Sequence, residues 1–192
     1  MIPSRTQCYP LWDTYNLPEK KRIHCELISK VAYFLGKELI TKGIKVHLDL
    51  LTASCLLHDI DKAVEKIPGS RHPDTAVRIL KEQNLPEVAE VVRTHSLHCI
   101  LDPKTAPVTW EQKVLYLVDK MVKQELIGVD ARFALWYAEN LPPQAKAELD
   151  ASLSLVKKLE MEIFTVTGIT DTTHLAKIVR QSQSQYPETS AK

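Results

Sequence analysis

The sequence contains little glycine: 5 of its 192 residues. Sandwiches and barrels need many tight turns, so this shortage argues against a loop-rich β fold and favours helices. No apolar run approaches the roughly 20 residues that a membrane-spanning helix requires. The opening residues, MIPSRTQCYPLW, lack the basic segment and apolar core of a signal peptide. We therefore expect no membrane partner.

The four cysteines form no CxxC motif and no close pair. This spacing favours reduced, buried thiols over a disulfide framework, and it is typical of a cytoplasmic protein. The formal net charge of +1 gives no electrostatic reason to expect nucleic acid as the main partner. A small anionic substrate remains compatible with this charge, because local charge can matter where global charge does not.

Apolar periodicity predicts an all-α fold, built as one compact helical bundle without a strand. The expected helices are 17–43, 46–59, 73 to about 84, 86–96, 110–125, 130–140, 142–168 and 172–183. We expect an irregular N-terminal arm over 1–17, a single domain over 18–182 and a flexible tail over 183–192. Within the domain, a core at about 20–135 would hold the functional residues, and the C-terminal helices would occupy 136–182.

Polar residues fall on the apolar faces of these predicted helices. His24, His58 and His95 each continue an apolar stripe, and Asp119 lies among apolar residues of the fifth helix. A lone inward histidine is more often a core residue than a ligand. A buried carboxylate is more informative, because an unpaired buried charge costs several kcal/mol. Lys120 follows Asp119 directly, but adjacent helical residues point away from each other. Imidazole and carboxylate together favour a divalent transition metal such as Mn, Fe, Zn or Co.

A known family shows the same order of residues. In SCLLHDIDKA, residues 54–63, an apolar run ends in His58-Asp59. The succession of His24, this pair and Asp119 resembles the H…HD…D pattern of the HD-domain superfamily of metal-dependent phosphohydrolases. The resemblance covers about 20–135 and implies an HD-type helical bundle.

The segment HDIDK resembles the HD-I-G-K motif of the dinuclear branch of that superfamily, with Asp61 in place of the glycine and Lys62 retained. His72 and His95 match the two additional histidines of this branch. The nearest resemblance is to the YqeK-type hydrolases, which split diadenosine tetraphosphate symmetrically. RHPDTAVRIL, VVRTHS and VTWEQKVLYLVDKM are similar to their segments, whereas KMVKQELIGVDAR replaces their proline- and arginine-containing segment.

The resemblance implies one or two divalent ions, namely Fe, Mn or Co, with Zn and Mg as further options. The implied ligands of the first ion are His24, His58, Asp59 and Asp119, and those of the second are Asp59, His72 and His95. Asp59 would bridge the two positions, because its two oxygens can each serve one cation. Two metals about 3.5–4 Å apart activate a water and hold an in-line phosphate, and Asp59 would therefore be central to catalysis.

Four further residues lie near this pattern. Lys62 could bind a substrate phosphate, and a solvated lysine at a helix end is an equally weighted alternative. Asp61 could orient water or protonate the leaving group, although a capping role is favoured. His98 lies one helical step from His95 and could contact phosphate or the second metal, although a rim position is somewhat favoured. Arg71 could bind phosphate, with plain surface charge as its alternative.

We expect a metal-dependent phosphohydrolase or phosphodiesterase that cleaves a phosphate ester or anhydride of a small nucleotide-like substrate by metal-activated hydroxide. A dinucleoside polyphosphate is one candidate substrate. The alternatives are a non-catalytic HD-type module for ligand sensing or interaction, and a di-iron HD-type oxygenase. The stripe of Leu149, Leu153, Val156, Leu159 and Ile163 indicates core or a dimer face, so a homodimer stays open.

Overall fold

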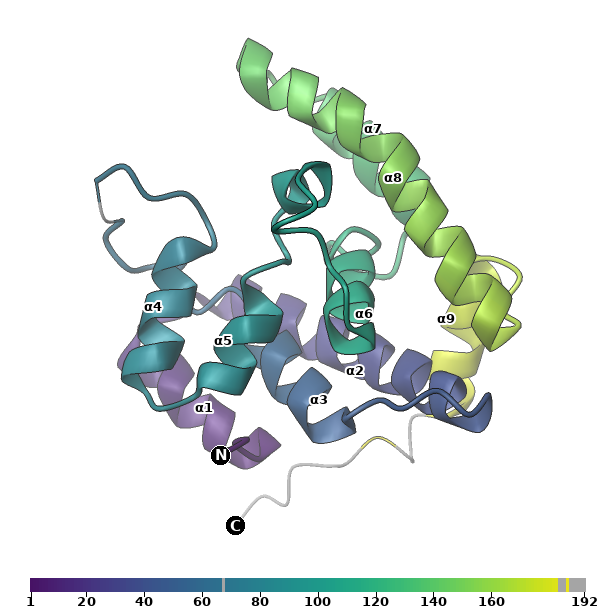
Figure 1. Ribbon diagram of the computed structural model, residues 1–192, viewed down its shortest axis with the longest axis horizontal. Coiled ribbons are helices and arrows are strands. Elements are labelled where there is room, and N and C mark those ends of the chain that lie inside the picture. The colour runs from purple at the N-terminus through teal and green to yellow at the C-terminus, as the bar shows by residue number, and fades with distance from the viewer. Residues whose placement is uncertain (67, 183–185, 187–192) are drawn as a thin grey trace.

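The computed structural model describes residues 1–66, 68–182 and 186. Its described part contains helices and no named strand, which confirms the all-α prediction (Figure 1). The helices are α1 (Arg5–Thr14), α2 (Glu19–Thr41), α3 (Leu48–Leu57), α4 (Asp74–Glu82), α5 (Pro86–Val92), the short 3₁₀ helix η1 (Leu97–Leu101), α6 (Trp110–Asp119), α7 (Val129–Tyr137), α8 (Pro143–Thr167) and α9 (Thr172–Gln181). No helix among these residues is long and apolar enough to cross a membrane.

Helix α2 is the central element, and it packs against α3, α6, α8 and α9. Pro18 lies at its N-cap, and the chain turns at Gly43 just beyond its end. Gly36 allows the close approach of α3: a Cβ atom there would lie 2.7 Å from Leu48 Cδ2 and 3.1 Å from Leu51 Cδ2. The close packing of α2 on α3 brings the inner faces of both helices, and the polar residues on them, together.

The expectation of an irregular arm over 1–17 is wrong, because Arg5–Thr14 forms α1. Pro10 lies inside this helix, where a proline costs about 3 kcal/mol. Cys8 and Trp12 are buried, and Trp12 Nε1 donates a hydrogen bond of 2.8 Å to the carbonyl of Leu56 on α3. Burial of a large apolar side chain stabilises by roughly 1.5–3 kcal/mol. Tertiary packing therefore outweighs the local preference at Pro10.

Helix α6 ends at Asp119 instead of continuing to 125. The chain turns back there: the amides of Ile127 and Gly128 both donate to the carbonyl of Met121, at 2.9 and 3.0 Å. Gly128 has a φ of +85°, which favours glycine, and it precedes α7. The early end of α6 makes Asp119 the last residue of the helix, directly before Lys120 at the C-cap.

The long helix α8 runs along one side of the molecule, with η1 and α6 among its neighbours (Figure 1). Leu149, Val156, Leu159 and Ile163 of its apolar stripe are buried within this chain. These four residues are therefore core, and Leu153 of the same stripe is partly buried against it. The predicted flexible tail over 183–192 lies outside the described residues except for Tyr186, which is buried and donates a hydrogen bond of 2.8 Å to Ser29 Oγ.

Candidate metal centre

The HD pair lies in the turn that follows α3. Helix α3 ends at Leu57, His58 is its C-cap, and the chain then passes through successive turns to residue 63. Leu57 and Ile60 are fully buried and hold the turn against the core. His58 is 0% exposed and Asp59 only 4%. The pair is therefore interior, although it lies where a helix ends.

The first cluster of possible ligand atoms is formed by residues from three elements. His24 comes from α2, the HD pair from the turn after α3, and Asp119 from the end of α6. Asp119 Oδ1 lies 3.2 Å from His24 Nε2 and 3.7 Å from His58 Nε2. His58 Nε2 also lies 3.7 Å from Asp59 Oδ2. Nitrogen and oxygen ligands at 2.0–2.2 Å from one ion lie about 3.0–3.5 Å apart, so small shifts would fit these atoms to a divalent metal.

A second cluster lies on the other side of Asp59. Asp59 Oδ1 is 3.4 Å from His72 Nε2 and 3.9 Å from His95 Nε2. The two Nε2 atoms of these histidines are 2.8 Å apart. Asp59, His72 and His95 can thus hold one ion, while Asp59, His24 and His58 can hold another. The two oxygens of Asp59 face different clusters, as a bridging carboxylate requires.

The hydrogen bonds at the outer nitrogens of the histidine rings fix their chemistry. Each Nδ1 atom lies beside an oxygen that accepts a hydrogen bond and does not donate one. The pairs are His24 with Lys123 O (3.0 Å), His58 with Cys55 O (2.7 Å), His95 with Val92 O (2.6 Å) and His72 with Asp61 Oδ2 (3.0 Å). Each of these oxygens would hold a proton on Nδ1, so that Nε2, which faces the centre, would be free to bind a metal.

The donor set fits a borderline divalent transition metal. It consists of four imidazole nitrogens and two carboxylates, which suit Mn, Fe, Co and Zn. His58 Nε2 is fully buried and has no hydrogen-bond partner among the described residues. A buried polar atom without a partner is costly, and a cation at this point would satisfy it. The assignment of the six side chains as ligands stays a prediction that this geometry supports.

Three lysines lie close to the two carboxylates. Lys21 Nζ is 2.8 Å from Asp59 Oδ2, and Lys62 Nζ is 3.1 Å from Asp59 Oδ1. Lys120 Nζ is 2.5 Å from Asp119 Oδ2, so the expectation that this lysine points away is wrong. The reason is that α6 ends at Asp119 and the lysine, at the C-cap, is no longer part of the helix.

Sequence reasoning missed Lys21 and Lys120 as members of the site. Lys21 had a usable signal, since it lies three residues before His24 and so shares its helical face. Lys120 is 2% exposed, and its ammonium also donates to the carbonyl of His95 at 2.5 Å. The position of Lys120 depends on where α6 ends, and periodicity did not give that end point.

These charges determine the protonation of the two carboxylates. Burial acts to raise the pKa of Asp59, but His58, Lys62 and Lys21 outweigh it and hold that pKa well below its ordinary value. Burial opposes ionisation of Asp119 too, and Lys120 and His24 are the main groups that lower its pKa nonetheless. Both residues are therefore ionised at neutral pH, in the form that binds a cation.

The two histidines that are fully enclosed titrate differently. Burial and the neighbouring His72 lower the pKa of His95 well below its ordinary value. Burial also acts to lower the pKa of His58, but Cys25 and Asp59 overcome it and raise that pKa. His95 is thus ready to act as a ligand at neutral pH, whereas His58 must first lose a proton.

The remaining predicted residues lie around the second cluster. Lys62 Nζ is 3.2 Å from His72 Nε2, so Lys62 belongs to the site. The carboxylate of Asp61 contacts His72, and within the described residues it caps no helix. Arg71 is half exposed and binds Glu148 of α8 at 2.9 Å. His98, in η1, is partly exposed and belongs to neither ligand cluster among the described residues. The phosphate contacts predicted for Lys62, Arg71 and His98 stay predictions.

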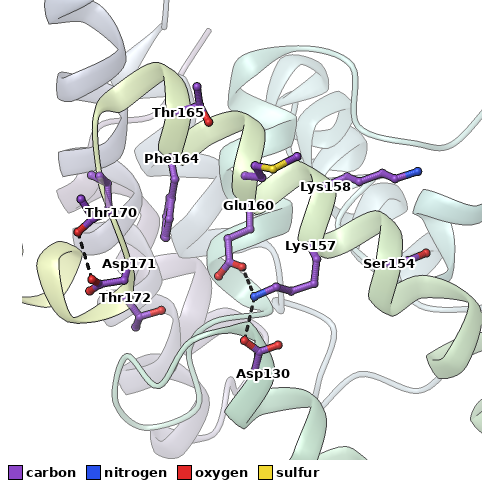
Figure 2. Close-up of a pocket in the computed structure, with 12 residues that line it drawn as sticks. Asp130, Ser154, Lys157, Lys158, Glu160, Phe164, Thr165, Thr170, Asp171 and Thr172 are labelled. Atoms are coloured by element: carbon purple, nitrogen blue, oxygen red, sulfur yellow. Dashed lines mark hydrogen bonds and ion pairs between the residues drawn. The ribbon is translucent and has the colours of Figure 1, made fainter.

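A separate surface pocket of about 570 Å³ lies between α7, α8 and the start of α9 (Figure 2). Three of its charged groups are paired with each other, because Lys157 Nζ lies 2.9 Å from Asp130 and 2.5 Å from Glu160. The described residues that line it include no predicted ligand of the metal centre. The pocket is therefore distinct from the cluster of histidines and carboxylates.

Comparison with protein families matches residues 23–124 to the HD domain. The matched segment is more than half of the chain and contains all six predicted ligands. Neither the curated proteins nor the solved structures gave a significant match. The family is in general one of metal-dependent hydrolases, and the histidine and aspartate clusters described above fit a metal site. The chain belongs to the HD domain family.

Proposed function

We propose that this protein is a phosphohydrolase or phosphodiesterase with two divalent transition-metal ions, and that it cleaves a phosphate ester or anhydride of a small nucleotide-like substrate. The observation that supports this most directly is the orientation of the imidazole rings. Four Nε2 atoms converge on Asp59 and Asp119 from separate elements, and each ring has an oxygen beside its Nδ1. A set of core histidines without a common ligand has no reason to share this orientation.

Each side chain of the centre has a role in the proposal. His24, His58 and Asp119 would hold the first ion, His72 and His95 would hold the second, and Asp59 would serve both positions. When bound, two such ions activate water and neutralise the charge of a phosphoryl group in line with it. Fe, Mn or Co are the proposed ions, with Zn or Mg as alternatives. The chain itself therefore supplies ligands and orientation, and no covalent nucleophile is needed.

Two lysines beside Asp59 are the proposed contacts of substrate phosphate. Lys21 and Lys62 approach Asp59 from opposite oxygens, and their side chains are 37% and 30% exposed. Each ammonium therefore faces both the ligand cluster and solvent. We propose that both contact the non-bridging oxygens of a substrate phosphate. Lys120 differs, because it is buried, and we assign it to orienting Asp119.

The substrate class follows from the charge of the site and from the resemblance in its motifs. A net charge of +1 gives no broad attraction for nucleic acid, but two lysines beside a metal site attract a compact anion. The similarity of HDIDK, RHPDTAVRIL and VVRTHS to the YqeK type supports a dinucleoside polyphosphate as one candidate. We propose mononucleotides and cyclic dinucleotides as the other classes to compare with it.

The test is a phosphate-release screen over these three substrate classes, with metal-stripped protein refilled with Mn, Fe(II), Co, Mg or Zn in turn. We expect Asp59→Ala and His58→Ala to abolish turnover while the fold is retained, because most of the core is aliphatic. His174→Ala is the matched control, since His174 is partly exposed on α9 and far from this motif in sequence.

Three results would contradict the proposal. Near-wild-type hydrolysis by Asp59→Ala would show that the centre is not the active site. Metal binding without turnover of any substrate class would favour a sensing or interaction module. Oxygen consumption with a carbon substrate and no phosphate release would favour the di-iron oxygenase.

A further inference from the structure

His72 is held differently from the other histidines of the centre. His58 and His95 each bond through Nδ1 to the backbone carbonyl three residues earlier, and His24 also bonds to a carbonyl. His72 lies in the loop before α4, with its own carbonyl held by Ser96 Oγ at 2.9 Å. Its Nδ1 bonds to a carboxylate, Asp61 Oδ2, at 3.0 Å. The ring of His72 is thus oriented by a side chain and not by the backbone.

The position of Asp61 is unusual for a carboxylate that has no function. The residue is 7% exposed, and within the described residues His72 is the one side chain to which its carboxylate bonds. Its other oxygen, Oδ1, is buried without a hydrogen-bond partner in that part of the chain. A buried, half-satisfied carboxylate destabilises a fold. Its contact with a predicted metal ligand gives a functional reason for keeping it.

We infer that Asp61 is a positioning residue for the second metal ion, and this inference rests on the two-metal function proposed above. The carboxylate keeps the proton of His72 on Nδ1, so that Nε2 faces the ion, and it makes the imidazole a stronger donor. It also brings a negative charge near the second ion, which has fewer predicted carboxylate ligands than the first. The first ion has two carboxylate ligands, Asp59 and Asp119, whereas the second has only the shared Asp59.

The inference gives Asp61 a role distinct from those predicted for it from the sequence. A residue that protonates a leaving group would act only during turnover. A positioning residue changes the metal-free protein and its affinity for metal, with no substrate present. These properties can be measured separately from activity, and Asp61 itself need not touch the substrate.

The experiment compares Asp61→Ala and Asp61→Asn with the wild-type chain and with Asp74→Asn as control. Asp74 is exposed and accepts a hydrogen bond of 2.9 Å from the amide of Arg71 in the same loop, so its variant reports on loop disturbance alone. Mn(II) is titrated into metal-stripped protein, and bound Mn per chain is measured. In the metal-free protein, ¹⁵N-histidine spectra report the tautomer of each ring, with the His72 signal assigned by its loss in His72→Ala.

We expect the wild type and Asp74→Asn to bind two Mn ions per chain. Asp61→Ala should lose about tenfold to a hundredfold in affinity for the second ion, with the first unaffected. In the metal-free Asp61→Ala protein, His72 should shift from the Nδ1–H tautomer to a mixture, while His58 and His95 stay unchanged. Asp61→Asn keeps an acceptor oxygen without the charge, so its loss of affinity for the second ion should be smaller. This variant tests the positioning role of Asp61 if the alanine variant unfolds.

Unchanged affinity for the second ion together with an unchanged His72 tautomer in both variants would overturn the inference. Failure of the proposed function looks different, because the wild type itself would then bind fewer than two Mn ions. In that case the proposed effect of Asp61 on the second ion is refuted together with the proposed function. The tautomer of His72 in metal-free protein still decides whether Asp61 orients the ring.

Discussion

The substitution Asp119→Asn tests two interactions of one carboxylate. Oδ1 of Asp119 lies 3.2 Å from His24 Nε2 in the first ligand cluster, and Oδ2 lies 2.5 Å from the ammonium of Lys120. Asparagine keeps the shape of the side chain but removes its charge. We expect the substitution to weaken metal binding and the pairing with Lys120 together.

The structural cost comes from Lys120. Its Nζ has the carbonyl of His95 and the ring of Tyr116 as its other neighbours, the ring centroid being 4.6 Å away. Removal of one member of a buried ion pair costs about 3–5 kcal/mol. The side chain of Asp119 is 17% exposed, so we discount this to about 2 kcal/mol for solvent screening. For a chain of this size that lowers Tm by about 4–8 °C.

The metal effect should be larger than tenfold, because direct ligation matters at least as much as outer contacts that cost about 10–100-fold. A double variant separates the two effects. Lys120→Met removes the charge that Asp119→Asn leaves unpaired, so the double variant should recover most of the lost stability and still bind Mn weakly. Asp130→Asn is the control, because Asp130 is itself 79% exposed in its ion pair with Lys157, and it should change stability by less than about 1 kcal/mol.

The measurements are thermal melts of metal-free and Mn-loaded protein, together with Mn titrations. Wild-type Mn affinity in Asp119→Asn would mean that Asp119 serves only as the partner of Lys120, and the last member of the H…HD…D pattern would be misassigned. Unchanged stability of the metal-free variant would refute the cost assigned to the buried lysine. No recovery in the double variant would refute it as well.

Four further predictions follow from contacts described above. His72→Ala or His95→Ala should lower bound Mn from two ions per chain to one with loss of most activity, and unchanged metal content would mean that these histidines are core or substrate contacts. Mn affinity should rise with pH through the raised pKa of His58, because binding displaces that proton, and a titration that is flat with pH would contradict this. By the same linkage, the contribution of His58 to the stability of the metal-free protein is complete below its ordinary pKa of 6.5. It is lost as pH rises through the raised pKa of the folded state. Urea melts of wild type and His58→Ala at several pH values can measure this loss. Trp12→Phe should cost about 1–2 kcal/mol in urea unfolding with no change in Mn affinity, because it removes the hydrogen bond to Leu56 O, and equal stability would contradict that.

Much of the fold could be predicted because its helices are long and periodic. The apolar stripe of α2 placed His24 on the inner face, and the same reasoning placed Asp119 among buried residues of α6. Residue 10 misled the prediction for α1, because a proline indicates local irregularity and says nothing about the packing of Trp12 on α3. Local preference and tertiary packing disagreed there, and packing prevailed.

The candidate site, like the fold, could be predicted only in part. Residue types in order along the chain were enough to select six possible ligands, since each lies on an inward face or in a motif. The orientation of the rings was not accessible, because Nδ1 of His24 bonds to a carbonyl 99 positions away, at Lys123. The same is true of Lys120, whose contact with Asp119 depends on one helix end.

Position 61 shows how a residue outside the shared motif can affect a predicted metal ligand. In the HD-I-G-K motif that the chain resembles, a glycine at this position offers no side chain to a neighbouring histidine. Asp61 lies in a turn held by buried Ile60, and its carboxylate reaches His72 eleven positions later in the chain. A departure from the motif that looks neutral in sequence thus changes the surroundings of one predicted ligand. The strength of the second metal site in this protein should therefore depend on a residue that the shared pattern does not include.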